Sequence, residues 1–254
     1  MATALPSLNM RHTVCKMRSF SDVPVLGILG GMGPGAAVDF QQRILDASPA
    51  QIDQQHIPTL VWNHGAIPDR QLALKQQGES PLSALLQGLR LLEQAGVSRI
   101  AIPCNTAHYW HPDLQQATAI PILNMVEITV EKVRHRLKLG DKVGILATRG
   151  ALLTNLYQQE LQKFDIPYVI NSAQDIEQLF MPAVYQVKRN ELQAAGQVFE
   201  QLCQRLVDQG ASAIILACTE IPLGLNAIQS PIRQLCLDTT QILAEACVDW
   251  FYQQ

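Results

Sequence analysis

The stretch GILGGMGPGA, residues 27–36, joins an apolar run to a glycine-rich turn and then to a helical pattern. The apolar run covers 24–29, and the residues after the turn place Ala37, Phe40 and Ile44 on one face of a helix. A strand, a tight turn and a helix in this order form the repeating unit of α/β proteins with parallel sheets. The stretch therefore predicts a parallel sheet covered by helices.

The same alternation continues along the chain. Seven further runs rich in β-branched residues and leucine are predicted strands, at 57–62, 99–102, 120–123, 142–147, 166–170, 212–217 and 232–237. Helical patterns lie between them. In one, leucines at 82, 85, 86 and 89 share a face, with Ser80 as the cap and Gly96 as the stop. A second begins at Leu192 and ends at Gly210.

An internal repeat divides this pattern into two similar halves. The sequence GIL at 27–29 recurs at 144–146, 117 positions later, and Cys104 recurs as Cys218, 114 positions later. Each cysteine stands at the carboxyl end of a predicted strand, the edge where parallel sheets bind ligands. If the halves face each other, both cysteines face one cleft.

The predicted fold is α/β, with two pseudo-symmetric Rossmann-like domains and the active site in the cleft between them. Each domain is expected to hold a parallel four-stranded sheet flanked by helices. Residues 24–123 together with 239–254 form the first predicted domain, and 124–238 form the second. Residues 1–23 are predicted to be a disordered N-terminal extension, because they lack the apolar core of a secretory signal.

Composition excludes several classes of protein. The 254 residues are 48% apolar and 16% charged, too apolar for a disordered chain, and the net charge of -3 shows no basic face for nucleic acid. No apolar run approaches the roughly 20 residues that span a bilayer. Six cysteines without a CxxC pair give no disulfide framework, so we expect a cytoplasmic protein with free thiols.

The glycine turn itself has three interpretations. Gly31, Gly33 and Ala36 match the G-x-G-x-x-A pattern of dinucleotide sites, but the second strand ends in residues 62–64, Trp-Asn-His, without the acidic residue that binds ribose. Free N–H groups at the start of the following helix can instead bind a carboxylate. A tight turn without any ligand is the third interpretation.

Cys104 and Cys218 are the candidate reactive groups. Cys104 is followed by Asn105 and Thr106, whose polarity argues against a purely structural thiol, and it can serve as a nucleophile, proton carrier or metal ligand. His108 and His111 make zinc an alternative, although no fourth ligand completes a familiar spacing. The other cysteines, at 15, 203, 236 and 247, are assigned to packing or to the N-terminal tail.

Two basic residues can recognise an acidic substrate. Arg70 ends the loop IPDR at 67–70, and an arginine fork is well suited to clamp a carboxylate, although an arginine on such a loop is more often solvated. Lys188 precedes Arg189, and by its surroundings alone it reads as a solvated charge at a helix end.

Four segments together, at 27–36, 67–70, 102–110 and 216–222, resemble the aspartate/glutamate racemase family, specifically its aspartate racemase branch. The resemblance covers residues 24 to 254. It implies a cytoplasmic, cofactor-independent homodimer that needs neither pyridoxal phosphate nor metal, and that interconverts L- and D-aspartate. By the resemblance, Cys104 and Cys218 are the paired acid and base, and the first acts on D-aspartate and the second on L-aspartate.

The resemblance also implies a set of substrate-binding residues. Arg70 and Lys188 are expected to hold the side-chain carboxylate, and the remaining contacts are expected from Met32, Gly33, Asn63, Asn105, Thr106 and Thr219. Two departures from glutamate racemases favour the aspartate branch: the first glycine turn lacks an Asp-Ser pair, and Glu220 replaces a histidine. A racemase or isomerase acting on glutamate, hydantoin or maleate, and a non-catalytic protein that binds acidic amino acids, remain alternatives.

Overall fold

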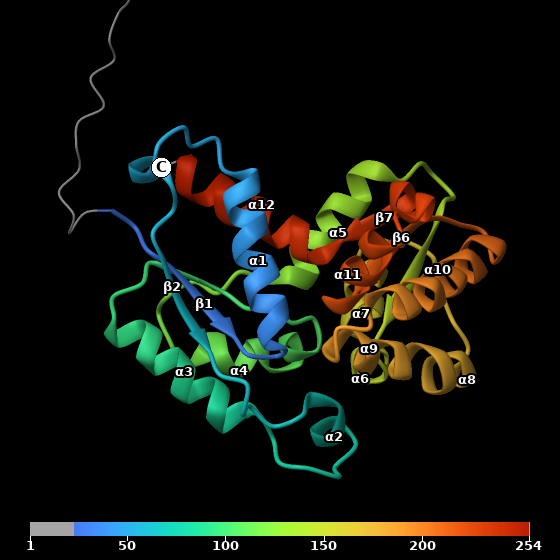
Figure 1. Ribbon diagram of the computed structural model, residues 1–254, viewed down its shortest axis with the longest axis horizontal. Helices are drawn as coiled ribbons and strands as arrows, with labels where there is room; N and C mark the ends of the chain where they lie inside the picture. The colour runs from blue at the N-terminus through green and yellow to red at the C-terminus, as the bar shows by residue number, and fades with distance from the viewer. Residues whose placement is uncertain (1–22, 254) are drawn as a thin grey trace, which may run out of the picture.

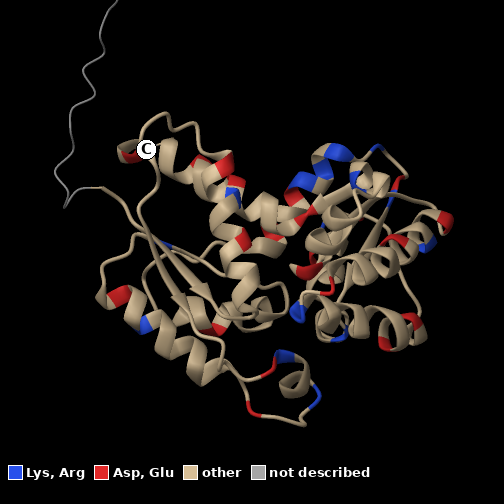
Figure 2. Cartoon of the chain, viewed as in Figure 1, with Lys and Arg blue, Asp and Glu red and all other residues tan. Residues whose placement is uncertain are grey.

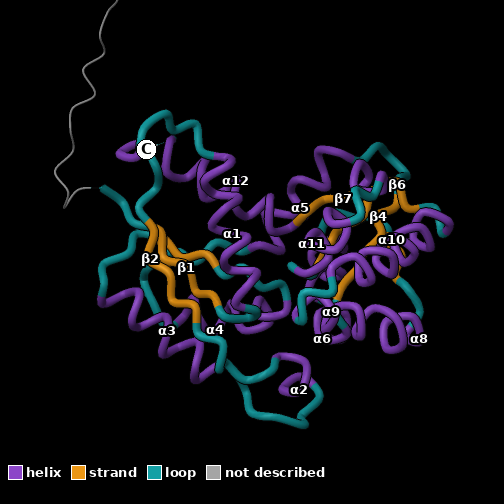
Figure 3. Tube along the Cα trace, in the orientation of Figure 1, coloured by secondary structure: helices purple, strands orange, loops and turns teal. Residues whose placement is uncertain are grey.

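The computed structural model describes residues 23–253, and it contains two parallel sheets in two halves that lie side by side (Figures 1 and 3). The first sheet has the order β2-β1-β3, with β1 (Leu26–Gly30), β2 (Thr59–Asn63) and β3 (Arg99–Ala101). The second has the order β5-β4-β6-β7, with β4 (Lys142–Ala147), β5 (Tyr168–Ile170), β6 (Ala211–Ala217) and β7 (Cys236–Asp238). The predicted α/β fold with two parallel sheets is confirmed.

Helices and short helical turns connect the strands. In the first half these are α1 (Pro34–Ala47), η2 (Asp53–Gln55), α2 (Arg70–Leu74), α3 (Leu82–Gln94), η3 (Thr106–Trp110), α4 (His111–Gln116) and the C-terminal α12 (Thr239–Tyr252). In the second half they are α5 (Met125–Arg136), α6 (Arg149–Leu153), α7 (Leu156–Gln162), α8 (Ala173–Asp175), the π-helical turn η4 (Ile176–Phe180), α9 (Met181–Lys188), α10 (Leu192–Asp208), α11 (Glu220–Ala227) and η5 (Pro231–Leu235).

The first sheet has three strands, so the prediction of four strands was wrong for this half. The segment 120–123 forms only an isolated bridge between Ile122 and Ile100. Two physical reasons shorten it. Pro121 has no N–H to donate to a neighbouring strand, and Asn124 already caps α5 by accepting from the backbone N–H of Val126. In the second half, 232–235 of the predicted last strand belong to η5, which begins with Pro231.

Both sheets are buried between helices, as parallel sheets require. On one face of the first sheet, Leu29 and Ile100 pack against Leu85 and Leu89 of α3. Gly88 permits this contact, because a Cβ there would lie 2.2 Å from the Trp62 ring. Each fully buried apolar side chain of this size contributes about 1.5–3 kcal/mol. The predicted stop at Gly96 is present as a residue with φ of +76°.

Helix α12 returns from the second half to the first (Figure 1). Its Leu243 and Cys247 share one buried cluster with Leu26 of β1 and Phe40 of α1. An ion pair of 2.6 Å between Arg43 and Asp238 lies at the start of this crossing. These contacts pack α12 against the first half, while the predicted domain bounds stay a prediction. The predicted disordered extension, apart from residue 23, lies outside the described residues.

The distributions of charge and hydropathy say little about where a functional site lies. Acidic and basic residues occur on both halves, as Figure 2 shows. Within residues 23–253, no helix combines the length and the apolarity that crossing a bilayer requires.

Candidate active site

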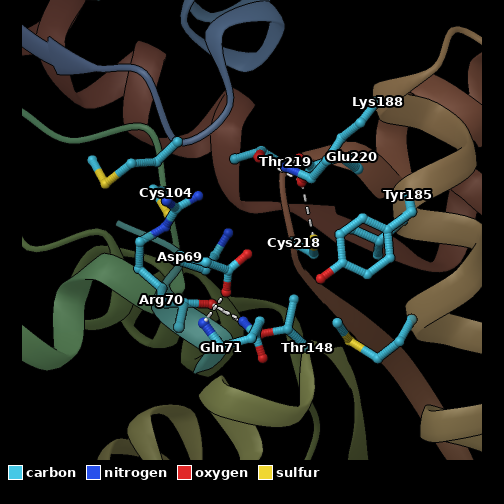
Figure 4. A pocket seen from close by; sticks show the side chains of 15 residues that line it. Asp69, Arg70, Gln71, Cys104, Thr148, Tyr185, Lys188, Cys218, Thr219 and Glu220 are labelled. Carbon is cyan, nitrogen blue, oxygen red and sulfur yellow. Dashed lines mark hydrogen bonds and ion pairs between the residues drawn. The ribbon is translucent and has the colours of Figure 1, made fainter. Parts of the chain in front are cut away.

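One cavity lies between the halves, where the carboxyl ends of both sheets meet (Figure 4). The first half contributes Met32, Asp69, Arg70, Gln71, Cys104, Asn105 and Thr106. The second half contributes Thr148, Met181, Val184, Tyr185, Lys188, Cys218, Thr219 and Glu220. Both cysteines that the internal repeat relates to each other therefore line the same cavity.

Cys104 follows β3 and opens the turn η3. The thiol is buried, and this burial raises its pKa above the ordinary value, while the positive charge of Arg70 opposes the rise. Figure 4 shows Arg70 on the Cys104 side of the cavity. Of the two cysteines, Cys104 is therefore the one with an arginine to stabilise its thiolate.

His108 supports the Cys104 loop from behind. Its Nδ1 lies 2.9 Å from the carbonyl oxygen of Cys104, and the backbone N–H of Met125 donates to its Nε2 at 3.1 Å. The ring is therefore neutral, with its proton on Nδ1. Burial lowers the pKa of His108 to about 4. Because both ring nitrogens bond the backbone, His108 is not arranged as a zinc ligand, and residues 23–253 contain no cluster of three or more metal-binding side chains.

Cys218 follows β6 and has a very different neighbour, Glu220. The thiol donates to Glu220 Oε2 at 3.1 Å, and the hydroxyl of Thr219 donates to the same oxygen at 3.0 Å. The other oxygen, Oε1, forms an ion pair of 2.8 Å with Lys188 of α9. Burial and the Glu220 charge together raise the pKa of Cys218 well above its ordinary value.

The Lys188–Glu220 pair is ionised. Burial alone would raise the pKa of Glu220, but Lys188 and the hydrogen bonds to the carboxylate lower it below the ordinary value. Burial likewise disfavours the Lys188 charge, but Glu220 outweighs this and raises the pKa of Lys188. Gly33 lies beside the pair, since a Cβ there would be 3.5 Å from Lys188 Nζ.

Asn105 and Thr106 connect the two halves. Tyr157 donates its hydroxyl to Asn105 Oδ1, and Asn105 Nδ2 donates to Thr239 at 3.0 Å. The Thr106 hydroxyl lies 2.9 Å from that of Thr148. Asn105 and Thr106, both predicted to contact the substrate, therefore already form hydrogen bonds that hold the Cys104 loop against the second half.

Arg70 is placed by the start of α2. Asp69 caps this helix by accepting from the backbone N–H groups of Gln71 and Leu72 at 2.6 and 3.0 Å. The Arg70 Nη1 donates to the carbonyl oxygens of Ile67 and Pro68, at 3.2 and 3.0 Å. Since these partners are neutral, the guanidinium keeps its charge available to the cavity.

The structure brings together most of the predicted site residues. Besides the two cysteines, the cavity is lined by Met32, Arg70, Asn105, Thr106, Lys188 and Thr219. Gly33 lies next to it. Asn63 is not among the lining residues: it is exposed, and its amide donates to the carbonyl oxygen of Pro34 at 3.2 Å.

Several lining residues were not predicted as site residues. Met181, Val184 and Tyr185 of α9 form a wall beside Lys188. Val184, Tyr185 and Lys188 follow Met181 by three, four and seven residues, so all four side chains share one helix face. This spacing is visible in the sequence alone. Gln71, Thr148 and the contact between Cys218 and Glu220 depend on how the halves meet, and no local pattern announces them.

Comparison with known proteins agrees with this geometry. The family model described as Asp/Glu/Hydantoin racemase matches residues 29–247, most of the chain and both cysteine segments. The chain belongs to this family. The family resemblance predicted from the four segments is thus confirmed, and the chain is a member of a racemase family.

Two relatives of this chain span nearly its whole length. It is 29% identical to the broad specificity amino-acid racemase of Bacillus subtilis over 235 residues, which cover 89% of this chain and 98% of the relative. It is 29% identical to the aspartate racemase of Picrophilus torridus, with a TM-score of 0.77 over 90% of this chain and 94% of that one.

A more distant structure shares the fold of this chain. It is an aspartate racemase homologue from Pyrococcus horikoshii, 19% identical, with a TM-score of 0.70 over 91% of this chain and 100% of that one.

Proposed function

We propose that this protein is an amino-acid racemase that interconverts L- and D-aspartate without pyridoxal phosphate, with Cys104 and Cys218 as the two bases. One observation carries the proposal. Two buried cysteines at matched strand ends of a repeated chain line one cavity between the halves. Racemisation requires removal of the Cα proton from one face and its return to the other, and two thiols from two halves meet this requirement.

Each turnover moves one proton from Cα to one cysteine and one proton from the other cysteine to Cα. One cysteine enters as thiolate and takes the Cα proton, so that a C–H bond breaks and an S–H bond forms. The electron pair stays on Cα and spreads into the α-carboxylate. The opposite cysteine gives its proton to the other face and becomes the thiolate. A thiol has a pKa near 8.5 in water, close enough to neutrality for both protonation states to take part.

The carbanion needs donors around the α-carboxylate, which gains charge in the transition state. The hydroxyl of Thr219 is already used by Glu220, and that of Thr106 by Thr148. Backbone groups are the better candidates. Helix α1 begins at the cavity edge, just after the lining residue Met32, and no side chain caps its first N–H groups. Such free N–H groups bind carboxylates.

Arg70 is the proposed partner of the substrate's side-chain carboxylate. Its hydrogen bonds go to neutral carbonyls, so it can form a bidentate pair with a carboxylate. Lys188, the other predicted partner, already forms an ion pair with Glu220. Of the two basic residues, Arg70 therefore gives the stronger recognition of an acidic side chain.

A racemase of broader specificity is the second candidate. Lys188 is already paired with Glu220, and the cavity wall beside it includes the apolar side chains of Met181 and Val184. Such an apolar wall can also accept amino acids that lack a second carboxylate. The relative from Bacillus subtilis, with its broad specificity, fits this candidate.

The test incubates each of several L-amino acids with the enzyme in D2O and follows deuterium at Cα together with optical rotation. We expect aspartate to exchange and racemise fastest. Equal rates for neutral amino acids would favour the second candidate, and no exchange with any amino acid would exclude a racemase. Cys104→Ala and Cys218→Ala should each abolish racemisation, whereas Cys203→Ala, a buried cysteine in α10, should not.

The homodimer implied by the resemblance stays a prediction. Sedimentation velocity over a range of protein concentrations measures it directly.

A further inference from the structure

Glu220 places a carboxylate beside one of the two cysteines, which the two-base reaction does not by itself require. Its side chain is 8% exposed, and its carboxylate accepts from the Cys218 thiol and the Thr219 hydroxyl and pairs with Lys188. Three donors on one buried carboxylate stabilise its anionic form. The structure therefore holds a fixed negative charge 3.1 Å from one catalytic sulfur.

A carboxylate at this distance favours the thiol form of Cys218 in the substrate-free protein. An S–H group donates to the oxygen, whereas a thiolate there would be a second anion in contact with the first. Among residues 23–253, Lys188 is the cation that acts on Cys218, and its charge is already shared with Glu220.

The charges facing Cys104 have the opposite balance. Arg70 is the group with the largest electrostatic effect on Cys104, and it favours the thiolate. Lys188 acts in the same direction and Glu220 acts against it, both more weakly than Arg70. Figure 4 shows Arg70 beside Cys104 and Glu220 beside Cys218. The two cysteines are thus related by the repeat, but their electrostatic surroundings differ.

We propose that Glu220 is a positioning residue that keeps Cys218 as the thiol in the substrate-free protein, so that Cys104 is the cysteine that ionises first and serves as the resting base. The role of Cys104 as a base rests on the proposed racemase function. The protonation order itself is a property of the free protein.

This asymmetry has a consequence for turnover. After one passage through the reaction, Cys104 holds the proton and Cys218 is a thiolate beside Glu220. The resting state returns when Cys104 loses a proton to water and Cys218 gains one. Since the two enantiomers have equal free energy, kcat/KM must be the same in both directions. The asymmetry therefore appears in kcat and KM taken separately.

The test measures alkylation of each cysteine by iodoacetamide in the whole, substrate-free protein, with peptide mass spectrometry to assign the sites, over a range of pH. Cys104 and Cys218 are 6% and 4% exposed, so access differs little and the rates report ionisation. We expect Cys104 to react about tenfold faster or more near neutral pH, the ratio that one pKa unit produces. Equal rates, or a faster Cys218, would overturn the proposal without any variant.

Variants at Glu220 supply the second measurement. Glu220→Gln should raise the alkylation rate of Cys218 and leave a smaller difference from Cys104, whereas Glu220→Asp, which keeps the charge, should preserve the difference. Glu191→Gln is the matched control, since Glu191 is exposed and pairs with Arg189 at the end of the same helix as Lys188. A Glu220→Gln protein with unchanged or slower Cys218 alkylation would contradict the proposal.

Because alkylation needs no turnover, the two proposals fail separately. If the alkylation rates are as expected but no deuterium enters at Cα, the racemase proposal is excluded and the proposed protonation order stands. If deuterium enters at Cα but the two cysteines are alkylated at equal rates, the protonation order is excluded and the racemase proposal stands.

Discussion

Lys188 of α9 and Glu220 of α11 form an ion pair, with 2.8 Å between Nζ and Oε1, that joins two helices at the edge of the cavity. The Lys188 side chain is about one-third exposed, while that of Glu220 is buried. Glu220 therefore depends on Lys188 for compensation of its charge more than Lys188 depends on Glu220.

Lys188→Met should destabilise the protein, because it leaves a buried carboxylate without its cation. We expect a loss of about 1–3 kcal/mol in the free energy of unfolding, reduced from the cost of a fully buried pair by the exposure of Lys188. Urea unfolding at neutral pH measures it. The double variant Lys188→Met/Glu220→Gln should recover most of the loss. A single variant as stable as the parent would show that the pair contributes little.

Arg70→Lys should weaken recognition of the side-chain carboxylate, because lysine keeps the charge but loses the planar fork. We expect KM for aspartate to rise by about tenfold, equivalent to about 1.4 kcal/mol, with a smaller change in kcat. Steady-state kinetics on aspartate gives both values. Arg189→Lys, on an exposed arginine, is the control. An unchanged KM would argue that Arg70 does not bind substrate.

Gln71 should matter because it fixes the segment that carries Arg70. Its Oε1 accepts from the backbone N–H of Gly150 at 2.7 Å, and its Nε2 donates to Thr106 at 3.3 Å, so α2 is held against the second half. Figure 1 shows α2 projecting toward α6. We expect Gln71→Ala to raise KM for aspartate several-fold, while Gln77→Ala, an exposed residue of the same loop, leaves it unchanged. Equal kinetics in both variants would contradict this role.

His108 should make the folded protein sensitive to mild acid. Burial lowers its pKa from about 6.5 in the unfolded chain to about 4. The unfolded state therefore binds the proton first as the pH falls, and stability is lost between about pH 6.5 and about pH 4, by about 3 kcal/mol in total. Urea unfolding at several pH values measures this slope. His108→Asn should flatten it, and an unchanged slope in that variant would assign the acid sensitivity to other groups.

Much of the site was predictable because it depends on local patterns. The GIL repeat and the cysteines at matched strand ends predicted two similar halves and two facing thiols, and both Cys104 and Cys218 line the cavity. The strand at 120–123 was predicted from composition alone, and Pro121 and the cap at Asn124 limit it to a bridge.

The remaining features arise where the halves meet. Tyr157 reaches Asn105 across 52 positions, and Gln71 reaches Gly150 across 79. No periodicity or motif encodes contacts at such separations, because they depend on the relative placement of two independently patterned units. The same reason explains why Asn63 could be expected in the site from its motif and yet lies outside the cavity, bonded to Pro34.

The most direct test of the two-base account is the early distribution of deuterium when L-aspartate reacts in D2O. Two thiols on opposite faces predict that the first D-aspartate formed carries deuterium at Cα, while the remaining L-aspartate keeps its hydrogen. Deuterium entering the remaining L-aspartate as fast as it enters D-aspartate would mean that one group serves both faces, and it would contradict the account.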